Sequence, residues 1–149
     1  REERGLAYDV GSFVRRFHET GAFVVSAGVD NNQFEEALRV ILSVLSGVVR
    51  ENIGDAELER AREFYLGQLE LGLENSMNQM LWIGDQLVTL GRCRASSEVI
   101  EQVSRVRPED LRRVAQDLFR SQALHLSVVG PLDKSGEDRL RGLLRFSDS

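Results

Sequence analysis

The sequence of 149 residues contains little of what metal centres and disulfides need, with one cysteine, two histidines and two prolines. Cys93 alone can form neither an intrachain disulfide nor a cysteine zinc cluster. A zinc hydrolase motif requires two histidines at helical spacing beside a carboxylate, whereas His18 and His125 lie far apart in the sequence. We therefore expect no metal site and no catalytic residue on this chain.

An excess of positive charge and long apolar runs are also missing. Charged residues make up 29% of the chain and the formal net charge is -5, which argues against nucleic acids and anionic membranes as partners. No stretch approaches the roughly 20 apolar residues needed to span a bilayer, and no secretory leader is recognisable. We expect a soluble chain, and its single cysteine is compatible with the cytoplasm or the periplasm.

Isolated reactive residues have plain structural interpretations. Cys93 lies between Arg92 and Arg94 without a histidine in a cysteine-hydrolase context, and we interpret it as incidental. His18 is interpreted as a turn residue and His125 as a strand side chain beside Ser127. No GxGxxG follows a predicted strand, so nucleotide binding has no support.

Three larger groups are interpreted as surface or packing positions. Arginines mixed with acidic residues are typical of a solvated helix face, and these are Arg112, Arg113 and Arg120. Apolar residues at helical spacing are expected in the core rather than in a ligand groove, and these are Met77, Met80, Trp82 and Ile83. Glycines inside helical patterns are expected where a neighbour packs closely, and these are Gly47, Gly67, Gly72 and Gly84.

Alternation of apolar and polar residues predicts three strands, over residues 6–17, 22–29 and 123–129. In the first, Tyr8, Val10, Ser12 and Val14 share a face. The first two are separated by a turn-like segment and should form a hairpin. In the third, one face carries Leu124, Leu126 and Val128. Three strands leave a small sheet with an open edge, which invites pairing with another chain.

Helical periodicity alternates with these strands. A first helix is predicted from Phe34 to Val49, with a capping-box start at Asn32 and Glu35. A second is predicted from Asp55 and carries a stripe of Leu58, Ala61, Tyr65 and Leu69. A third is predicted to end near Gly91. Shorter ones are predicted at 96–105, at 108–120 with Leu111, Val114, Ala115 and Leu118 inward, and from Ser135. The fold class is therefore α+β, with helices packed on one face of a small, mainly antiparallel sheet, in a single partial domain over residues 1–149.

The opening residues Arg1-Glu2-Glu3-Arg4-Gly5-Leu6-Ala7-Tyr8 resemble a motif in the C-terminal, non-catalytic domain of pitrilysin/insulinase-family zinc peptidases. There an arginine and a tyrosine seven residues later face the active site. The resemblance covers almost the whole chain and continues in order through Gly21-Ala22-Phe23, residues 34–71, Gly91-Arg92, Pro108-Glu109-Asp110-Leu111 and residues 126–131. The family domain also begins before this arginine, so the resemblance implies an N-terminally truncated domain.

The resemblance implies that this chain binds substrate for a catalytic partner and does not itself perform the hydrolysis. The zinc cofactor and its HxxEH motif would lie on a partner domain or subunit, with the peptide substrate enclosed between two domains. Arg1 and Tyr8 would hydrogen-bond the substrate backbone or the oxyanion at the scissile carbonyl. The alternative is a catalytically dead scaffold subunit, as in the family's respiratory-complex relatives. A homodimer through the open sheet edge would supply the missing strand pairing.

Overall fold

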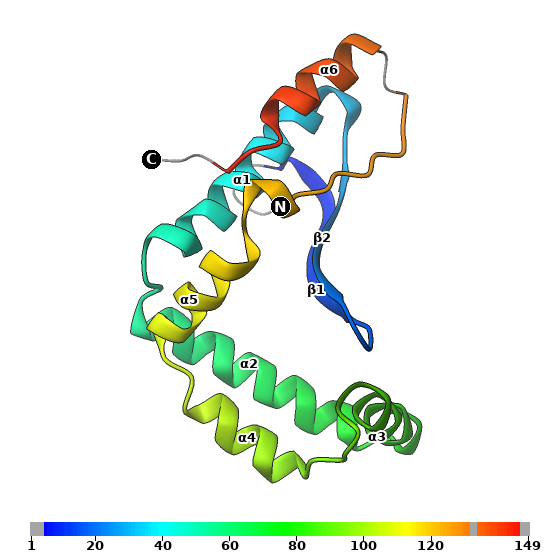
Figure 1. Ribbon diagram of the computed structural model, residues 1–149, viewed down its shortest axis with the longest axis vertical. Coiled ribbons are helices and arrows are strands. Elements are labelled where there is room, and N and C mark those ends of the chain that lie inside the picture. The colour runs from blue at the N-terminus through cyan, green and yellow to red at the C-terminus, as the bar shows by residue number, and fades with distance from the viewer. Residues whose placement is uncertain (1–4, 132–133, 147–149) are drawn as a thin grey trace. The chain divides into compact units, whose positions relative to one another are not determined.

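The computed structural model describes residues 5–131 and 134–146. The chain begins with two strands, β1 (Ala7–Arg16) and β2 (Gly21–Val29). Six helices follow in order, namely α1 (Phe34–Arg50), α2 (Asp55–Leu73), α3 (Ser76–Leu90), α4 (Ser96–Ser104), α5 (Pro108–Leu118) and α6 (Lys134–Leu143) (Figure 1). Short 3-10 turns cover Asn31–Gln33 and Ser121–Ala123. The α+β class expected from the sequence is confirmed.

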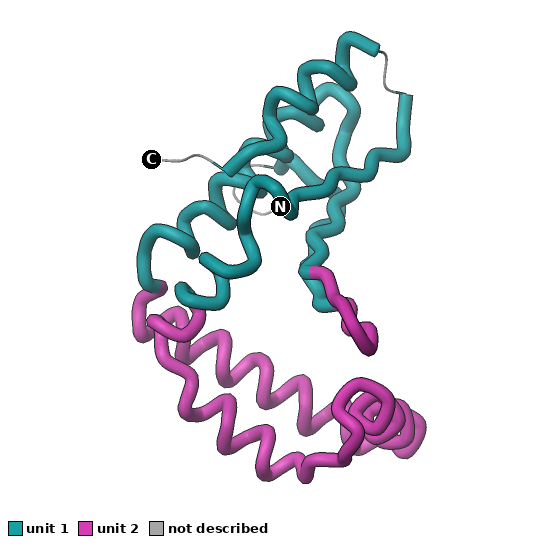
Figure 2. Tube along the Cα trace, in the orientation of Figure 1, with its two compact units in different colours: residues 1–14, 23–52, 112–149 teal, residues 15–22, 53–111 magenta. Residues whose placement is uncertain are grey.

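The chain forms two compact units, shown in different colours in Figure 2. Unit 1 comprises residues 1–14, 23–52 and 112–149, and unit 2 comprises residues 15–22 and 53–111. The tip of the hairpin therefore belongs to unit 2, and the boundary also falls within α5. The assignment of residues 1–149 to a single partial domain stays a prediction.

The hairpin expected from the first two alternating segments is confirmed, and β1 and β2 pair in a two-stranded antiparallel sheet. Its turn is closed by the Phe17 backbone N–H, which donates to the Thr20 carbonyl at 2.9 Å. Gly21 is required at the start of β2, because a Cβ there would lie 2.9 Å from the Arg15 carbonyl oxygen. A larger residue at position 21 would force the two strands apart.

The third predicted strand is wrong. After the 3-10 turn at Ser121–Ala123, residues 124–129 form no strand. Leu124, Leu126 and Val128 are nevertheless half-buried and pack on the core, while His125 and Ser127 between them are exposed. The alternation correctly identified the buried face, but a strand also needs a hydrogen-bonded partner, and none of the described residues pairs with this segment.

The core of unit 1 lies where α1, α6 and the segments on both sides of α6 meet. Its buried centre is formed by Leu38, Leu42, Leu140 and Phe146. Phe119 extends this cluster, with its ring centroid 5.2 Å from that of Phe23 and 6.1 Å from that of Phe146. Arg139 of α6 pairs with Glu35 of α1 at 2.6 Å. Burial of one apolar stripe on α1 is therefore what holds unit 1 together.

Side chains make contacts before the start and at the end of α1. Asp30 caps the preceding 3-10 turn by accepting a hydrogen bond from the Asn32 backbone N–H at 2.9 Å. The N-cap of α1 itself is Gln33, which makes no side-chain cap bond, so the capping-box start predicted at Asn32 and Glu35 is wrong. At the other end, Arg112 and Gln116 each donate to the Val49 carbonyl at 3.3 Å. These contacts satisfy groups that a helix end leaves without an intrahelical partner.

Unit 2 is formed by α2, α3 and α4 together with the hairpin tip, and it buries little apolar surface. Its buried apolar residues are Leu58 and Val99. Polar contacts connect the helices: Arg62 of α2 donates to the carbonyls of Val103 at 3.3 Å and Val106 at 3.0 Å, at the end of α4. Arg16 of the hairpin tip pairs with Asp85 of α3 at 3.8 Å, with both side chains exposed.

The ends of α3 are well defined. The Asn75 side chain accepts from the backbone N–H groups of Met77 at 2.9 Å and Asn78 at 3.2 Å. Gly91 ends the helix at φ +68, in the left-handed region that favours glycine. The end of this helix near Gly91 was predicted correctly from its C-cap glycine.

Several predicted helix faces are wrong. Met77, Met80 and Ile83 are exposed rather than in the core, and so are Ala61 and Tyr65 of the predicted α2 stripe. On α5, Ala115 is buried as expected, but Val114 and Leu118 are 43% and 50% exposed. A Cβ added at the helical glycines would meet no described atom within 4 Å, which contradicts their expected close packing at Gly47, Gly67, Gly72 and Gly84. Periodicity thus marked apolar faces that the described chain leaves uncovered.

Candidate functional site

The candidate substrate contact is Tyr8, near the start of β1. Its side chain is 73% exposed, as it would have to be to contact a substrate. Arg1, the other predicted contact, lies outside the described residues. The structure therefore places one of the two predicted site residues, and the pairing of Arg1 with Tyr8 stays a prediction.

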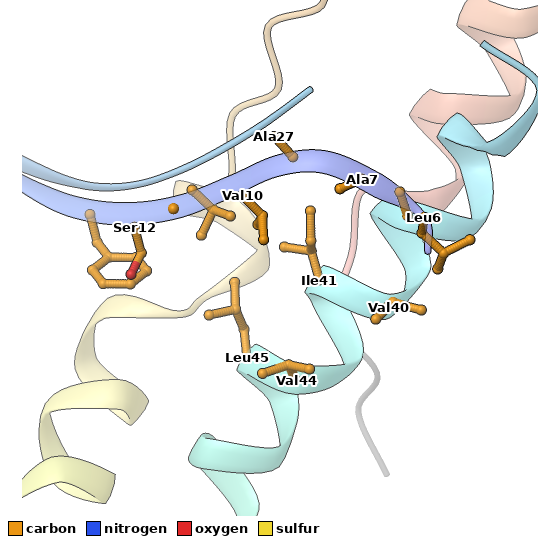
Figure 3. Close-up of a pocket in the computed structure, with 13 residues that line it drawn as sticks. Leu6, Ala7, Val10, Ser12, Ala27, Val40, Ile41, Val44 and Leu45 are labelled. Atoms are coloured by element: carbon orange, nitrogen blue, oxygen red, sulfur yellow. The ribbon is translucent and has the colours of Figure 1, made fainter. Parts of the chain in front are cut away.

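An apolar hollow of about 670 Å³ lies between the hairpin and α1, within unit 1. Val10 of β1 and Ile41 and Leu45 of α1 point toward one another across it (Figure 3). Tyr8 is on the strand that forms one wall, but it is not among the lining residues. The hollow and the exposed phenol are thus separate features of one hairpin.

The lining of the hollow has almost no polar chemistry. Among residues 5–131 and 134–146, Ser12 contributes the only side-chain hydroxyl of the lining, and no carboxylate, imidazole or basic side chain belongs to it. General acid-base catalysis needs a titratable group within hydrogen-bond reach of the reacting atom. The described lining is therefore suited to accept apolar side chains.

This hollow was not predicted from the sequence. A signal was present, because Ala7, Gly11 and Ser12 of β1 and Ala27 of β2 are small, and all four line it. Small side chains on paired strands leave space above the sheet that an ordinary helix residue does not fill. Their significance depends on which helix lies opposite, and that cannot be determined from the strands alone.

The residues do not fit a metal centre. Among residues 5–131 and 134–146, no group of three or more His, Cys, Asp or Glu side chains is close enough to hold an ion. His18 lies in the hairpin turn, as expected, and is exposed. His125 is exposed in the segment that replaces the third predicted strand, and Cys93 is an exposed free thiol after α3. No described helix is long and apolar enough to cross a membrane.

Residues 1–65 match the model of a family described as "Peptidase M16 inactive domain". The chain is 34% identical over 140 residues to an uncharacterized zinc protease of Streptomyces coelicolor. The aligned region covers 94% of this chain and 30% of that protein. It is 35% identical over 131 residues to an uncharacterized zinc protease of Mycobacterium tuberculosis, and this alignment covers 88% of this chain and 30% of that protein. The chain thus spans about a third of the length of these relatives.

A solved structure agrees with this assignment at the level of fold. A chain in "Complex III2 from Candida albicans, Inz-5 bound" superposes with a TM-score of 0.73 at 16% identity, covering 80% of this chain and 29% of that one. At that identity the likeness concerns the fold alone. The family match and the zinc-protease relatives lead to one conclusion: the chain belongs to the M16, or insulinase-type, peptidase family and corresponds to its inactive C-terminal domain.

Proposed function

We propose that this chain is the non-catalytic, substrate-binding half of a zinc metallopeptidase that encloses peptides between two domains. The observation that carries the proposal is the combination of membership in the inactive-domain family with an exposed Tyr8 on β1. The phenol can donate a hydrogen bond to a substrate carbonyl or to the oxyanion formed from it. Arg1 would add a charge-assisted hydrogen bond from the same segment.

Zinc and the general base would lie on a partner domain or subunit that bears HxxEH. The number of possible zinc ligands supports this division. The whole sequence has two histidines, and they lie in different units of the structure. Zinc peptidases need at least two histidines beside a carboxylate on one face of an element. This chain would contribute binding and orientation of the peptide, and the partner would contribute the hydrolytic chemistry.

The test is reconstitution. The chain is combined with the HxxEH-bearing half and zinc, and hydrolysis of an unstructured peptide is measured with and without a chelator. We expect cleavage that is sensitive to the chelator and requires both halves. A reconstituted complex that forms but cleaves nothing would contradict the proposal.

The role of Tyr8 is tested by Tyr8→Phe, which removes the hydroxyl and keeps the ring. Loss of one oxyanion donor lowers kcat by about 10²- to 10³-fold, and we expect a fall of that order with little change in KM. Tyr65→Phe is the matched control, because Tyr65 is the other tyrosine of the chain and lies on α2. Equal activity of the two variants would remove Tyr8 from the site.

Arg1→Ala is expected to raise KM and lower kcat together, because a charged contact to the substrate backbone acts before and during the reaction.

A second candidate is a catalytically dead scaffold subunit. The fold similarity to a chain in a Candida albicans complex III structure favours it, since that fold also occurs within a large assembly. The discriminating observation is the sequence of the partner domain. An HxxEH motif followed by a distant glutamate supports the peptidase, and its absence from every partner supports the scaffold.

Self-association is a further part of the proposal. The described sheet has only β1 and β2, so each strand has one edge without a neighbouring strand among the described residues. Open strand edges favour pairing with another chain. Analytical ultracentrifugation should show a homodimer that Val10→Pro in β1 weakens if this edge is used, whereas a monomer at all concentrations would contradict it.

A further inference from the structure

We draw no further inference here: the strongest candidate, the apolar hollow between the hairpin and α1 in unit 1, is an apolar surface of the described residues, and nothing in the structure shows what covers it.

Discussion

The two units of this chain are stabilised in different ways. Unit 1 buries a cluster of apolar side chains from α1, α6 and the segments around them, namely Leu38, Leu42, Leu140 and Phe146. The described part of unit 2 buries only Leu58 and Val99 among its apolar residues, and its helices are connected by Arg62, Gln86 and Arg94. Unit 1 therefore depends on the hydrophobic effect, and unit 2 depends to a larger extent on hydrogen bonds to partly buried backbone groups.

This difference also concerns what each unit leaves exposed. Unit 1 leaves an apolar hollow between the hairpin and α1, and unit 2 leaves apolar side chains of α3 exposed, among them Met77, Met80 and Leu87. The comparison predicts that unit 1 is sensitive to loss of apolar volume, and that unit 2 is sensitive to loss of caps and backbone hydrogen bonds.

The largest effect is expected for Leu140→Ala in unit 1. Leu140 is 3% exposed, and truncation of a buried leucine costs about 2–5 kcal/mol through lost transfer energy and a residual cavity. The free energy of unfolding, measured by urea denaturation followed by circular dichroism, should fall by that amount. Val129→Ala, at a position fully exposed to solvent, is the control and should change it by less than about 0.5 kcal/mol. Equal effects would show that the cluster does not stabilise unit 1.

The next effect is expected for Arg62→Met in unit 2. Arg62 is 18% exposed and donates to two carbonyls at the end of α4. Loss of hydrogen bonds from a charged donor costs about 1.5–3 kcal/mol, and the methionine keeps most of the side-chain volume. Amide hydrogen exchange in α4 should accelerate, whereas Arg60→Met at an exposed position of the same helix should leave it unchanged. If both variants exchange alike, polar contacts are not what holds α4.

A smaller effect is expected for Asn75→Ala at the start of α3. The variant loses the N-cap that accepts from Met77 and Asn78, which costs about 1 kcal/mol. Thermal unfolding can be followed by the fluorescence of Trp82, the only tryptophan of the chain, which lies on this helix. Asn78→Ala serves as the control because its side chain makes no cap. A midpoint lowered equally by both changes would count against the cap.

The smallest effect is expected for Gln86→Met. The substitution leaves the Arg94 N–H without its acceptor, but it also removes a buried Nε2 group that has no hydrogen-bond partner in the described part of the chain. These two changes have opposite signs and each is of order 1–3 kcal/mol, so the net change in unfolding free energy should stay below about 1 kcal/mol. Gln86→Ala, which adds a cavity, should cost more. A loss of about 3 kcal/mol for Gln86→Met would contradict this cancellation. It would show that the hydrogen bond between the Arg94 N–H and Gln86 outweighs the cost of the unpaired Nε2 group.

Local features of the chain were predictable from the sequence. The hairpin, the order of the helices and the ends at Pro108 and Gly91 depend on residues within a few positions of one another, and the structure confirms them. The start of α1 at Phe34 was predicted correctly, but its cap was not: Asp30 caps the 3-10 turn that precedes α1, and Gln33 at the N-cap of α1 makes no side-chain cap hydrogen bond. Tyr8 was singled out by resemblance, and its exposure agrees with a binding role that stays a prediction.

The sequence by itself determined where helices and hairpin form, which faces are apolar, and that two histidines and one cysteine provide no zinc-hydrolase motif. Only the tertiary structure decided which of those apolar faces are covered. Residues 124–129 alternate like a strand but find no described strand to pair with, and α3 turns Gln86 inward and its methionines outward. The physical reason is that periodicity is a property of one segment, whereas burial and strand pairing are properties of two, and the second surface need not lie within these 149 residues.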